Sequence, residues 1–463
     1  RIGARKGWEA VSSNGAAVLG SSRGIEAVFE FVKRDGTKIV FSAGNNKIFT
    51  GTSTLAAVTL PSGYSISANN WKIVSFNNDV YFFQRGHAAL VSVAGSTTLI
   101  AVADGGTAAP AANEVLAAYG RLWAADITAN KYVVYWSDLL DGDDWHGGSS
   151  GSLDLTLVWP TGFDEVVALS AHNGFLIIFG KKSMIVYSGA AAPASMTLSD
   201  TIEGIGCIAR DSVQHTGADI LFLSDTGVRS LGRTIQEKSL PLNDLSKNVR
   251  TDLTSLVPLQ TNAIKSLYSA DEAFYLLTLP DSDTTYCFDM RSPLQDGSQR
   301  ATTWSGLHPL AFTTTEAGDI YFGLSSGIVK YSGYLDGTAN YQMRYFSNPM
   351  DFGNASNLKF LKKFNITIIG GQNTKSTLNW GYDYSTNFTK QVFTLTGSVN
   401  AGEYGVSEYN TTAEYTATAI INTPKVNTSG NGEVVTIGLE TEINDTSFSI
   451  QKIDIHAILG RLI

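Results

Sequence analysis

A unit of about 47 residues recurs along the first 345 residues, and this repeat constrains the fold more than any other feature. Each unit contains an apolar strand, a turn of Gly, Asn, Asp or Glu, a second hydrophobic strand, another short turn and a third strand. The first turns lie near residues 36, 79, 120, 174, 219, 272 and 319. Because blades of β-propellers repeat at roughly 40–50 residues, the pattern predicts a propeller of about seven blades.

The composition of the middle strands supports stacked blades. The segments Phe175–Phe179 and Ile220–Leu223 are apolar at every position, which is typical of sheets that are covered on both faces. The alternative is a tandem of small β-domains, each with its own core. A unit of this length without disulfides or metals would bury too little surface to be stable alone, so the propeller is the better interpretation.

The pattern changes after residue 345, and the sequence predicts an all-β chain with three parts. Residues 1–24 are expected to form a basic N-terminal arm, and residues 25–345 the propeller. Residues 346–463 contain longer, alternating strands that predict a C-terminal β-sandwich. These expected strands cover residues 364–369, 390–395, 415–421 and 448–457. The only fair helix candidate runs from Asn243 to Leu256.

Charge and cysteine content exclude several classes of protein. The chain has 33 Lys and Arg against 42 Asp and Glu, a net charge of −9, which argues against a general nucleic-acid binder. Two cysteines, Cys207 and Cys287, cannot form a disulfide framework. No apolar stretch approaches the length of a membrane helix, so no membrane partner is expected. Charged residues make up only 16%, against roughly 25% in an average soluble domain, which leaves uncharged surface for subunit contacts.

The six histidines do not predict a metal or catalytic site. They are His87, His146, His172, His215, His308 and His456, scattered at one per repeat unit or fewer. Metalloproteases and similar enzymes place two histidines at fixed short spacing on one element, and no such spacing occurs here. We interpret these histidines as structural or surface residues.

Two charged motifs are candidate ligand sites. The segment from Asp138 to Trp145 holds four aspartates, and carboxylates on a tight loop can bind Ca²⁺. However, the spacing misses the EF-hand pattern and no Glu closes the loop, so a solvated loop anchored by Trp145 is the better interpretation. The pairs Lys181-Lys182 and Lys362-Lys363 could touch phosphates, but we interpret them as solvated turn charges.

Three further motifs resemble catalytic or phosphate-binding ones only in part. Ser224-Asp-Thr-Gly227 is similar to the Asp boxes of sialidase-like propellers, but its spacing differs and no Thr-Trp follows. Gly147–Gly151 matches the letters of a nucleophile elbow without the flanking strand and helix. Gly370-Gly371 is a turn pair with no helix after it. We therefore expect no catalytic residues, no bound cofactor and no metal, and thus no enzyme.

Several runs of residues, mostly from the blade cores, resemble one protein family. These runs are Arg5-Lys-Gly-Trp8, Gly120-Arg-Leu-Trp123, Tyr135-Trp-Ser-Asp138, Asn173-Gly-Phe-Leu176, Gly206-Cys-Ile-Ala-Arg-Asp-Ser-Val213 and Leu221-Phe-Leu-Ser-Asp-Thr-Gly-Val228. They are similar to the tail nozzle proteins of short-tailed bacteriophages, also called tail tubular protein B or packaged-DNA stabilisation proteins. The resemblance covers residues 1–335 well and the last third loosely.

The resemblance implies a structural protein of the virion tail, assembled in the host cytoplasm. It implies a homohexameric ring below the portal and its adaptor, with an attached tail fibre or tailspike. Such a ring continues the DNA channel and retains the packaged genome. The net charge of −9 agrees with a channel that conducts double-stranded DNA without gripping it. The long strands of the sandwich offer edges for β-augmentation.

Two other functions remain open from the sequence. A carbohydrate-binding or carbohydrate-active propeller, such as a receptor-binding tail protein, would use aromatic rings in loops, and Trp145 and Trp304 are the candidates. A scaffold propeller that binds peptides on one face is the third possibility.

Overall fold

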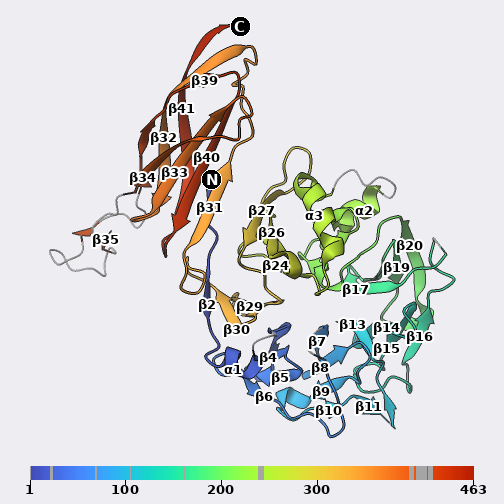
Figure 1. Cartoon of the computed structure of the whole chain (residues 1–463). Helices are drawn as coiled ribbons and strands as arrows, with labels where there is room; N and C mark the ends of the chain where they lie inside the picture. The colour runs from blue at the N-terminus through green and yellow to red at the C-terminus, as the bar shows by residue number, and fades with distance from the viewer. Residues whose placement is uncertain are drawn as a thin grey trace. The chain divides into compact units, whose positions relative to one another are not determined.

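The computed structural model describes nearly the whole chain (Figure 1), in the ranges 2–20, 24–67, 70–104, 106–160, 162–237, 244–395, 401–402, 414–415 and 421–462. It divides into two compact units. One unit runs from Ala10 to Lys330, and the other combines residues 1–9 with residues 331–463. None of the helices in these ranges combines the length and the apolar character needed to cross a bilayer.

The unit from Ala10 to Lys330 contains seven antiparallel blade sheets, one for each repeat, and a short antiparallel pair of β11 (Ala103–Asp104) and β12 (Thr107–Ala108). The first three blades are β3 (Ala27–Val32), β4 (Lys38–Gly44), β5 (Lys47–Thr50) and β6 (Ala56–Ala57); β7 (Trp71–Phe76), β8 (Asp79–Gln84), β9 (Leu90–Ser92) and β10 (Ile100–Ala101); and β13 (Ala112–Ala118), β14 (Arg121–Ile127), β15 (Val133–Trp136) and β16 (Gly151–Asp154).

The remaining four blades follow the same order. They are β17 (Val166–His172), β18 (Phe175–Gly180), β19 (Ser183–Ser188) and β20 (Thr197–Glu203); β21 (Gln214–His215), β22 (Ile220–Ser224) and β23 (Gly227–Ser230); β24 (Lys265–Ser269), β25 (Phe274–Leu279), β26 (Thr284–Asp289) and β27 (Arg300–Ser305); and β28 (Ala311–Thr314), β29 (Ile320–Leu324) and β30 (Gly327–Tyr331).

The first strand of each blade lies nearest the ring axis. Strand β3 contacts β7, β7 contacts β13, β13 contacts β17, β21 contacts β24, β24 contacts β28, and β28 contacts β3. The fourth and fifth blades meet through η3 (Arg210–Ser212), which contacts β17 and β22. The ring is therefore closed, and the predicted propeller of about seven blades is confirmed.

The seventh blade is a four-stranded sheet in the order β2-β30-β29-β28, in which β2 (Trp8–Ala10) is the fourth strand, and the chain near Val11 continues this contact. Val11 and Ser12 both donate backbone hydrogen bonds to the carbonyl of Ile328 in β30, at 3.0 and 3.1 Å. A segment from before the first blade thereby lies beside the last blade. Because the chain from before the first blade is hydrogen-bonded to the last blade, the sheet edge is paired where the first and last repeats meet.

Apolar middle strands form the core between blades, as the sequence pattern predicted. Phe179 of the fourth blade lies 5.2 Å from Phe222 of the fifth, ring centre to ring centre, and both side chains are fully buried. Trp123 is also fully buried and packs against Trp136 at 5.6 Å. Burial on both faces stabilises each blade only when its neighbours are present.

The fifth blade departs from the repeat. It has three strands, followed by helices α2 (Leu231–Glu237), η4 (Lys247–Val249), α3 (Arg250–Leu256) and η5 (Val257–Leu259) before β24 begins. The expected helix thus corresponds to η4 and α3, whereas Asn243 lies outside the described residues. Leu245 donates a backbone hydrogen bond to Val228 in β23, so the chain runs along this edge where other blades have a fourth strand.

The second unit is a sandwich of two sheets, as predicted for the C-terminal part. One sheet contains β1 (Ile2–Gly3), β41 (Phe448–Leu462), β32 (Asn357–Gly370), β37 (Ile421–Asn422), β38 (Lys425–Asn427) and β39 (Asn431–Gly432). The other has the order β31 (Tyr341–Phe346), β40 (Val435–Ile443), β33 (Lys375–Tyr382) and β34 (Thr389–Thr394). Phe364, Trp380 and Leu439 are among its buried core residues. Most of the expected strand 415–421 lies outside the described residues.

The unit boundaries differ from the ranges expected from sequence, 1–24, 25–345 and 346–463. The arm is divided: β1 pairs with β41, and Arg5 forms an ion pair of 2.6 Å with Asp336, while residues from Ala10 on belong to the propeller. Residues 331–345 also belong to the sandwich, because β31 alternates between half-buried and exposed side chains and pairs with β40. This alternation is that of a half-buried sandwich strand rather than a blade strand.

Candidate functional site

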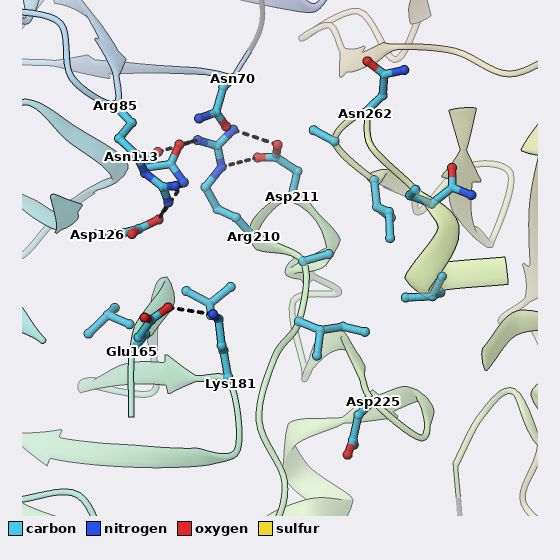
Figure 2. Close-up of a pocket in the computed structure, with 18 of the residues that line it drawn as sticks. Asn70, Arg85, Asn113, Asp126, Glu165, Lys181, Arg210, Asp211, Asp225 and Asn262 are labelled. Atoms are coloured by element: carbon cyan, nitrogen blue, oxygen red, sulfur yellow. Dashed lines mark hydrogen bonds and ion pairs between the residues drawn. The ribbon is translucent and has the colours of Figure 1, made fainter. Parts of the chain in front are cut away.

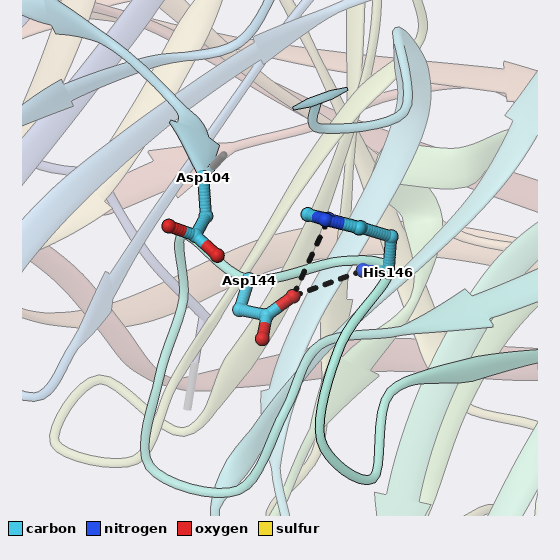
Figure 3. Close-up of side chains that lie close together, drawn as sticks. All are labelled: Asp104, Asp144 and His146. Atoms are coloured by element: carbon cyan, nitrogen blue, oxygen red, sulfur yellow. Dashed lines mark hydrogen bonds and ion pairs between the residues drawn. The ribbon is translucent and has the colours of Figure 1, made fainter. Parts of the chain in front are cut away.

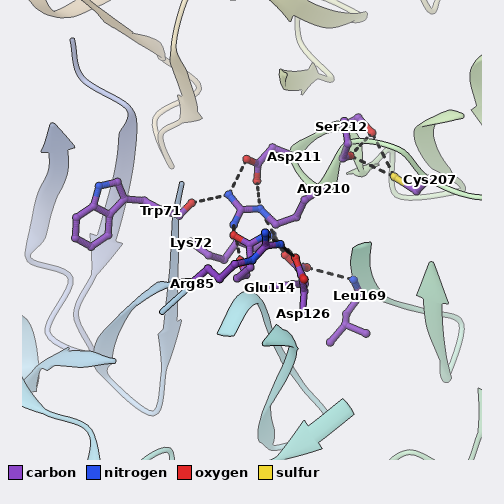
Figure 4. A network of polar contacts seen from close by, with 12 residues as sticks. Trp71, Lys72, Arg85, Glu114, Asp126, Leu169, Cys207, Arg210, Asp211 and Ser212 are labelled. Carbon is purple, nitrogen blue, oxygen red and sulfur yellow. Dashed lines mark hydrogen bonds and ion pairs between the residues drawn. The ribbon is translucent and has the colours of Figure 1, made fainter. Parts of the chain in front are cut away.

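A network of buried charges lies on the axis of the propeller (Figure 4). Its centre is Arg210, which follows the fourth blade and precedes the fifth. The guanidinium donates hydrogen bonds to the carbonyl of Trp71 at 2.8 Å and to Oδ1 of Asn113 at 3.0 Å. Trp71 and Asn113 belong to the second and third blades. Since these blades lie across the ring from the fifth, the Arg210 side chain spans the axis.

Two further ion pairs extend this axial network. Asp211 accepts two hydrogen bonds from Arg210, at 2.9 and 2.7 Å, and lies 2.7 Å from Nζ of Lys265 in the sixth blade. Glu114 lies 3.1 Å from Nζ of Lys72 and accepts a hydrogen bond of 3.2 Å from the backbone N–H of Leu169. The network therefore connects blades two to six.

The surroundings of Asp211 and Glu114 shift their pKa values in opposite directions. Burial alone would raise the pKa of Asp211, but Arg210 and Lys265 outweigh that effect and hold this pKa below its usual value. Burial raises the pKa of Glu114 in spite of the nearby Lys72. Arg210 is also buried, and its pKa is raised because Asp211 more than offsets the effect of burial. Each of these charges has an opposite charge beside it, which is what a buried charge requires in order to persist.

Beside this network lies a cavity of about 630 Å³ (Figure 2), within the usual size of ligand pockets. It opens on the face of the ring at which the first strand of each blade begins, which we call the start face. Its polar lining includes Asn70, Arg85, Asn113, Asp126, Lys131, Glu165, Lys181, Arg210, Asp211, Asp225, Gln260 and Asn262. Its apolar lining includes Val166, Val167, Ile208, Val257, Pro258 and Ile264. No aromatic ring lines this cavity among the described residues.

One wall of the cavity is a turn held by Asp164. This buried carboxylate accepts hydrogen bonds from the backbone N–H groups of Lys181 (3.0 Å), Lys182 (2.9 Å) and Ser183 (3.0 Å), and from the Ser183 hydroxyl at 2.8 Å. Such a set of donors to one carboxylate orders the turn between β18 and β19. The ordered turn presents Lys181 to the cavity.

Lys181 shares a carboxylate with a second lysine. Nζ of Lys181 lies 2.6 Å from Oε2 of Glu165, and Nζ of Lys131 lies 3.3 Å from the same oxygen. Hydrogen bonding from Lys181 lowers the pKa of Glu165, with a smaller contribution from Lys131. This corner of the cavity therefore carries two positive charges and one negative charge at neutral pH.

The opposite wall is held by Asp281. Its carboxylate accepts hydrogen bonds from the backbone of Asn262 at 2.9 Å and from the hydroxyl of Thr261 at 2.9 Å. Burial tends to raise the pKa of Asp281, but these hydrogen bonds outweigh it and lower the pKa. Gln260 accepts a hydrogen bond from the backbone of Asp281 at 2.9 Å. The segment from 257 to 264 is thus a defined surface rather than a loose loop.

The histidines are spread over the blades and the sandwich. Their contacts are His87 with Ser67 (2.7 Å), His215 with Ser170 (2.8 Å), His308 with Asp283 (2.5 Å) and His456 with Asn365 (2.9 Å); His172 is the last residue of β17. Burial lowers the pKa of His215, and His172 lies close enough to add to this effect. Among the described residues, His146 alone lies in a group of three possible metal ligands, with Asp104 and Asp144, whose ligand atoms lie within 4.8 Å of one another.

In that group Asp104 ends strand β11 (Ala103–Asp104), and Asp144 and His146 lie on the loop before β16; Asp104 and His146 are exposed and Asp144 is half-buried (Figure 3). Oδ1 of Asp144 accepts backbone hydrogen bonds from His146 at 3.0 Å and Gly147 at 2.7 Å. Asp141 similarly accepts one from Asp143 at 2.9 Å. These carboxylates shape the turns of the segment from Asp138 to Trp145, and the Trp145 ring anchors it.

The other sequence candidates form local contacts. Ser224 donates a hydrogen bond to the carbonyl of Gly227 at 2.9 Å within a strand turn. Ser149, in the Gly147–Gly151 loop, donates one to Asp138 at 2.5 Å. Strand β16 follows this loop, so the helix of a nucleophile elbow does not occur there. Gly370, the last residue of β32, and Gly371, in the turn that follows, both have positive φ.

The aromatic and lysine candidates are arranged differently from expectation. Trp145 and Trp304 are each only 8% exposed, so the expected loop aromatics are buried side chains. Lys182 is exposed, as expected. Lys362 is exposed and Lys363 is half-buried, but both lie within strand β32 and not in a turn as expected. Lys181, in contrast, lines the cavity, which the sequence did not indicate; its position directly after the apolar strand Phe175–Gly180 was the available signal.

Comparisons with known proteins give similarities of fold only. No family model matches the chain, and no curated protein matches it in sequence. PorZ of the type-IX secretion system of Porphyromonas gingivalis is 13% identical with a TM-score of 0.38, over 69% of this chain and 37% of that one. BamB from Moraxella catarrhalis is 10% identical with a TM-score of 0.40, over 66% and 84%.

A third solved structure covers more of the chain. The extracellular domain of the putative one-component system BT4673 from B. thetaiotaomicron is 9% identical with a TM-score of 0.45, over 85% of this chain and 55% of that one. This chain thus spans less than two thirds of both PorZ and the BT4673 domain. The strand pairing within the blades and the contacts between blades establish the propeller architecture of this chain.

Proposed function

We propose that the chain is a structural component of a short-tailed phage tail, a subunit of an oligomeric nozzle without catalytic activity. The observation that carries this proposal is the similarity of its blade motifs to those of tail nozzle proteins. One of these runs, Gly206–Val213, supplies Arg210 and Asp211 to the axial network. Another supplies Arg121, which is buried and donates a hydrogen bond to the carbonyl of Ser137 at 2.7 Å.

The axial network supports a mechanical role for the propeller. Because Arg210 spans the ring axis and contacts Trp71 and Asn113, the centre of each propeller is occupied by side chains. In the proposed assembly, DNA therefore passes through an opening between copies, and each propeller is a rigid block in the wall. The net charge of −9 is compatible with a wall that does not bind the DNA backbone.

Electron microscopy of the purified chain, alone and with an adaptor protein, tests this proposal. We expect a sixfold ring with a central opening wide enough for double-stranded DNA, and we expect the adaptor to bind one face of that ring. Antibodies against the chain should label the tail of intact particles. A chain that stays monomeric with the adaptor and is absent from purified virions would contradict the proposal.

The carbohydrate-binding alternative lacks the feature that motivated it. Sugar recognition by stacking needs exposed aromatic rings, and Trp145 and Trp304 are each only 8% exposed. Trp304 and Tyr286 line a second cavity of about 310 Å³, but neither ring is broadly exposed there. We therefore do not propose it as a second function.

A further inference from the structure

At one corner of the start-face cavity two lysines share a single carboxylate, whereas the cavity lining as a whole balances four Lys and Arg side chains against four Asp and Glu side chains. Lys131 and Lys181 both contact Oε2 of Glu165, so one carboxylate oxygen serves two ammonium groups. The Lys181 side chain is 55% exposed and that of Lys131 is 34% exposed. Each ammonium group has three N–H donors, so both can bind a further anionic group without giving up Glu165.

The rest of the cavity fits a peptide chain beside that anionic group. Val257 and Pro258 offer an apolar wall, and Asp225 lines the cavity as an exposed carboxylate that can accept hydrogen bonds from peptide N–H groups (Figure 2). A small carboxylate would use only the lysine corner. A peptide segment would use all three surfaces.

Exposed apolar side chains continue the surface beyond the cavity. Leu259, between two lining residues, is 66% exposed. Phe163 is 59% exposed and packs on Tyr132, which follows Lys131. Exposed large apolar groups beside a charged cavity are typical of protein-binding surfaces.

We propose that this cavity binds an acidic peptide segment of a partner protein, with a carboxylate on Lys131 and Lys181 and a neighbouring apolar side chain on Val257 and Leu259. The proposal stands independently of the proposed tail function, because it depends only on the chemistry of this surface.

An array of immobilised dodecapeptides tests it, with acidic content varied at constant apolar content. We expect the full chain to bind the acidic, apolar peptides and to lose binding when Asp and Glu are replaced by Asn and Gln. The Lys131→Gln/Lys181→Gln variant should bind the best peptide about tenfold more weakly, as expected when charge-assisted hydrogen bonds are removed. Affinities are measured by fluorescence polarisation of that peptide.

Matched variants separate this effect from a general loss of charge. Lys182→Gln removes a neighbouring, exposed charge and should leave the affinity unchanged, while Lys181→Arg should retain most of it. Thermal unfolding of each variant confirms that it is folded. The proposal is overturned by binding that does not depend on acidic content, by equal effects of Lys181→Gln and Lys182→Gln, by absence of binding to any peptide, or by free citrate binding as tightly as the best peptide.

Discussion

The guanidinium of Arg210 donates a hydrogen bond of 2.8 Å to the backbone carbonyl of Trp71, 139 residues earlier in the chain. Six of the seven blades are built from strands that follow one another in the sequence, so contacts within these blades are local in sequence. Contacts such as this one connect blades that lie across the ring. They complement the packing between adjacent blades and restrict how far the ring can open.

Replacing Arg210 is expected to destabilise the propeller strongly. The Arg210→Gln variant keeps a polar group but leaves Asp211 and Glu114 with less compensating charge in a buried site. Breaking a buried ion pair from one side typically costs about 3–5 kcal/mol in the free energy of unfolding. Chemical denaturation followed by tryptophan fluorescence measures the loss. The control is Arg291→Gln, which breaks an exposed pair with Asp289 and should cost no more than about 1 kcal/mol. Equal losses in the two variants would argue against an axial role for Arg210.

Asp211 makes the stability depend on pH in the acid range. Burial raises its pKa, but Arg210 and Lys265 outweigh this and lower it below the usual value. The folded state then binds fewer protons than the unfolded state, so the contribution of Asp211 is complete above about pH 4 and is lost as the pH falls through its folded pKa. Burial raises the pKa of Glu114, so Glu114 changes the stability with pH in the opposite direction. It is present both in the wild type and in a variant that lacks only the Asp211 carboxylate.

The Asp211→Asn variant should therefore be less stable than the wild type at neutral pH, and the difference should shrink as the pH falls below about 4. Unfolding free energies measured by denaturant titration over this range provide the comparison. If the difference in unfolding free energy stays constant with pH, Asp211 stabilises the fold through packing and hydrogen bonds and not through its negative charge.

The propeller could be predicted from the sequence because its signal is local. Segments such as Phe175–Phe179 carry their own burial pattern, and the turns between them recur at blade spacing. The axial network could not be predicted, since Arg210 and Glu114 meet only after the ring has closed. The expected boundary at residue 345 failed to include β31 (Tyr341–Phe346) in the sandwich, because a single alternating strand is assigned to a sheet only by its partner, β40.

Ring closure depends on Ser12 more than on its neighbour Ser13. The Ser12 hydroxyl accepts a hydrogen bond of 3.0 Å from the backbone N–H of Ile328, a fully buried residue. Ser12→Ala leaves that N–H without this acceptor and should cost about 1–3 kcal/mol. Ser13→Ala removes an exposed hydrogen bond to the carbonyl of Ser53 and should change stability by no more than about 0.5 kcal/mol. The midpoints of chemical denaturation give the comparison, and equal shifts would show that Ser12 has no special part in closure.

Both thiols should be unreactive while the chain is folded. Burial raises the pKa of Cys207 and of Cys287 to about 12. At pH 8 the reactive thiolate is then roughly one part in ten thousand of each thiol, against about a quarter for an ordinary cysteine with a pKa near 8.5. Titration with Ellman's reagent should detect almost no thiol in the native chain and two per chain in denaturant. Rapid reaction of both thiols in the native chain would show that a blade opens on the time scale of the assay, because the reagent reaches the fully buried Cys207 only if the packing between the fourth and fifth blades separates. Reaction of one equivalent would not show this, because Cys287 is only partly buried.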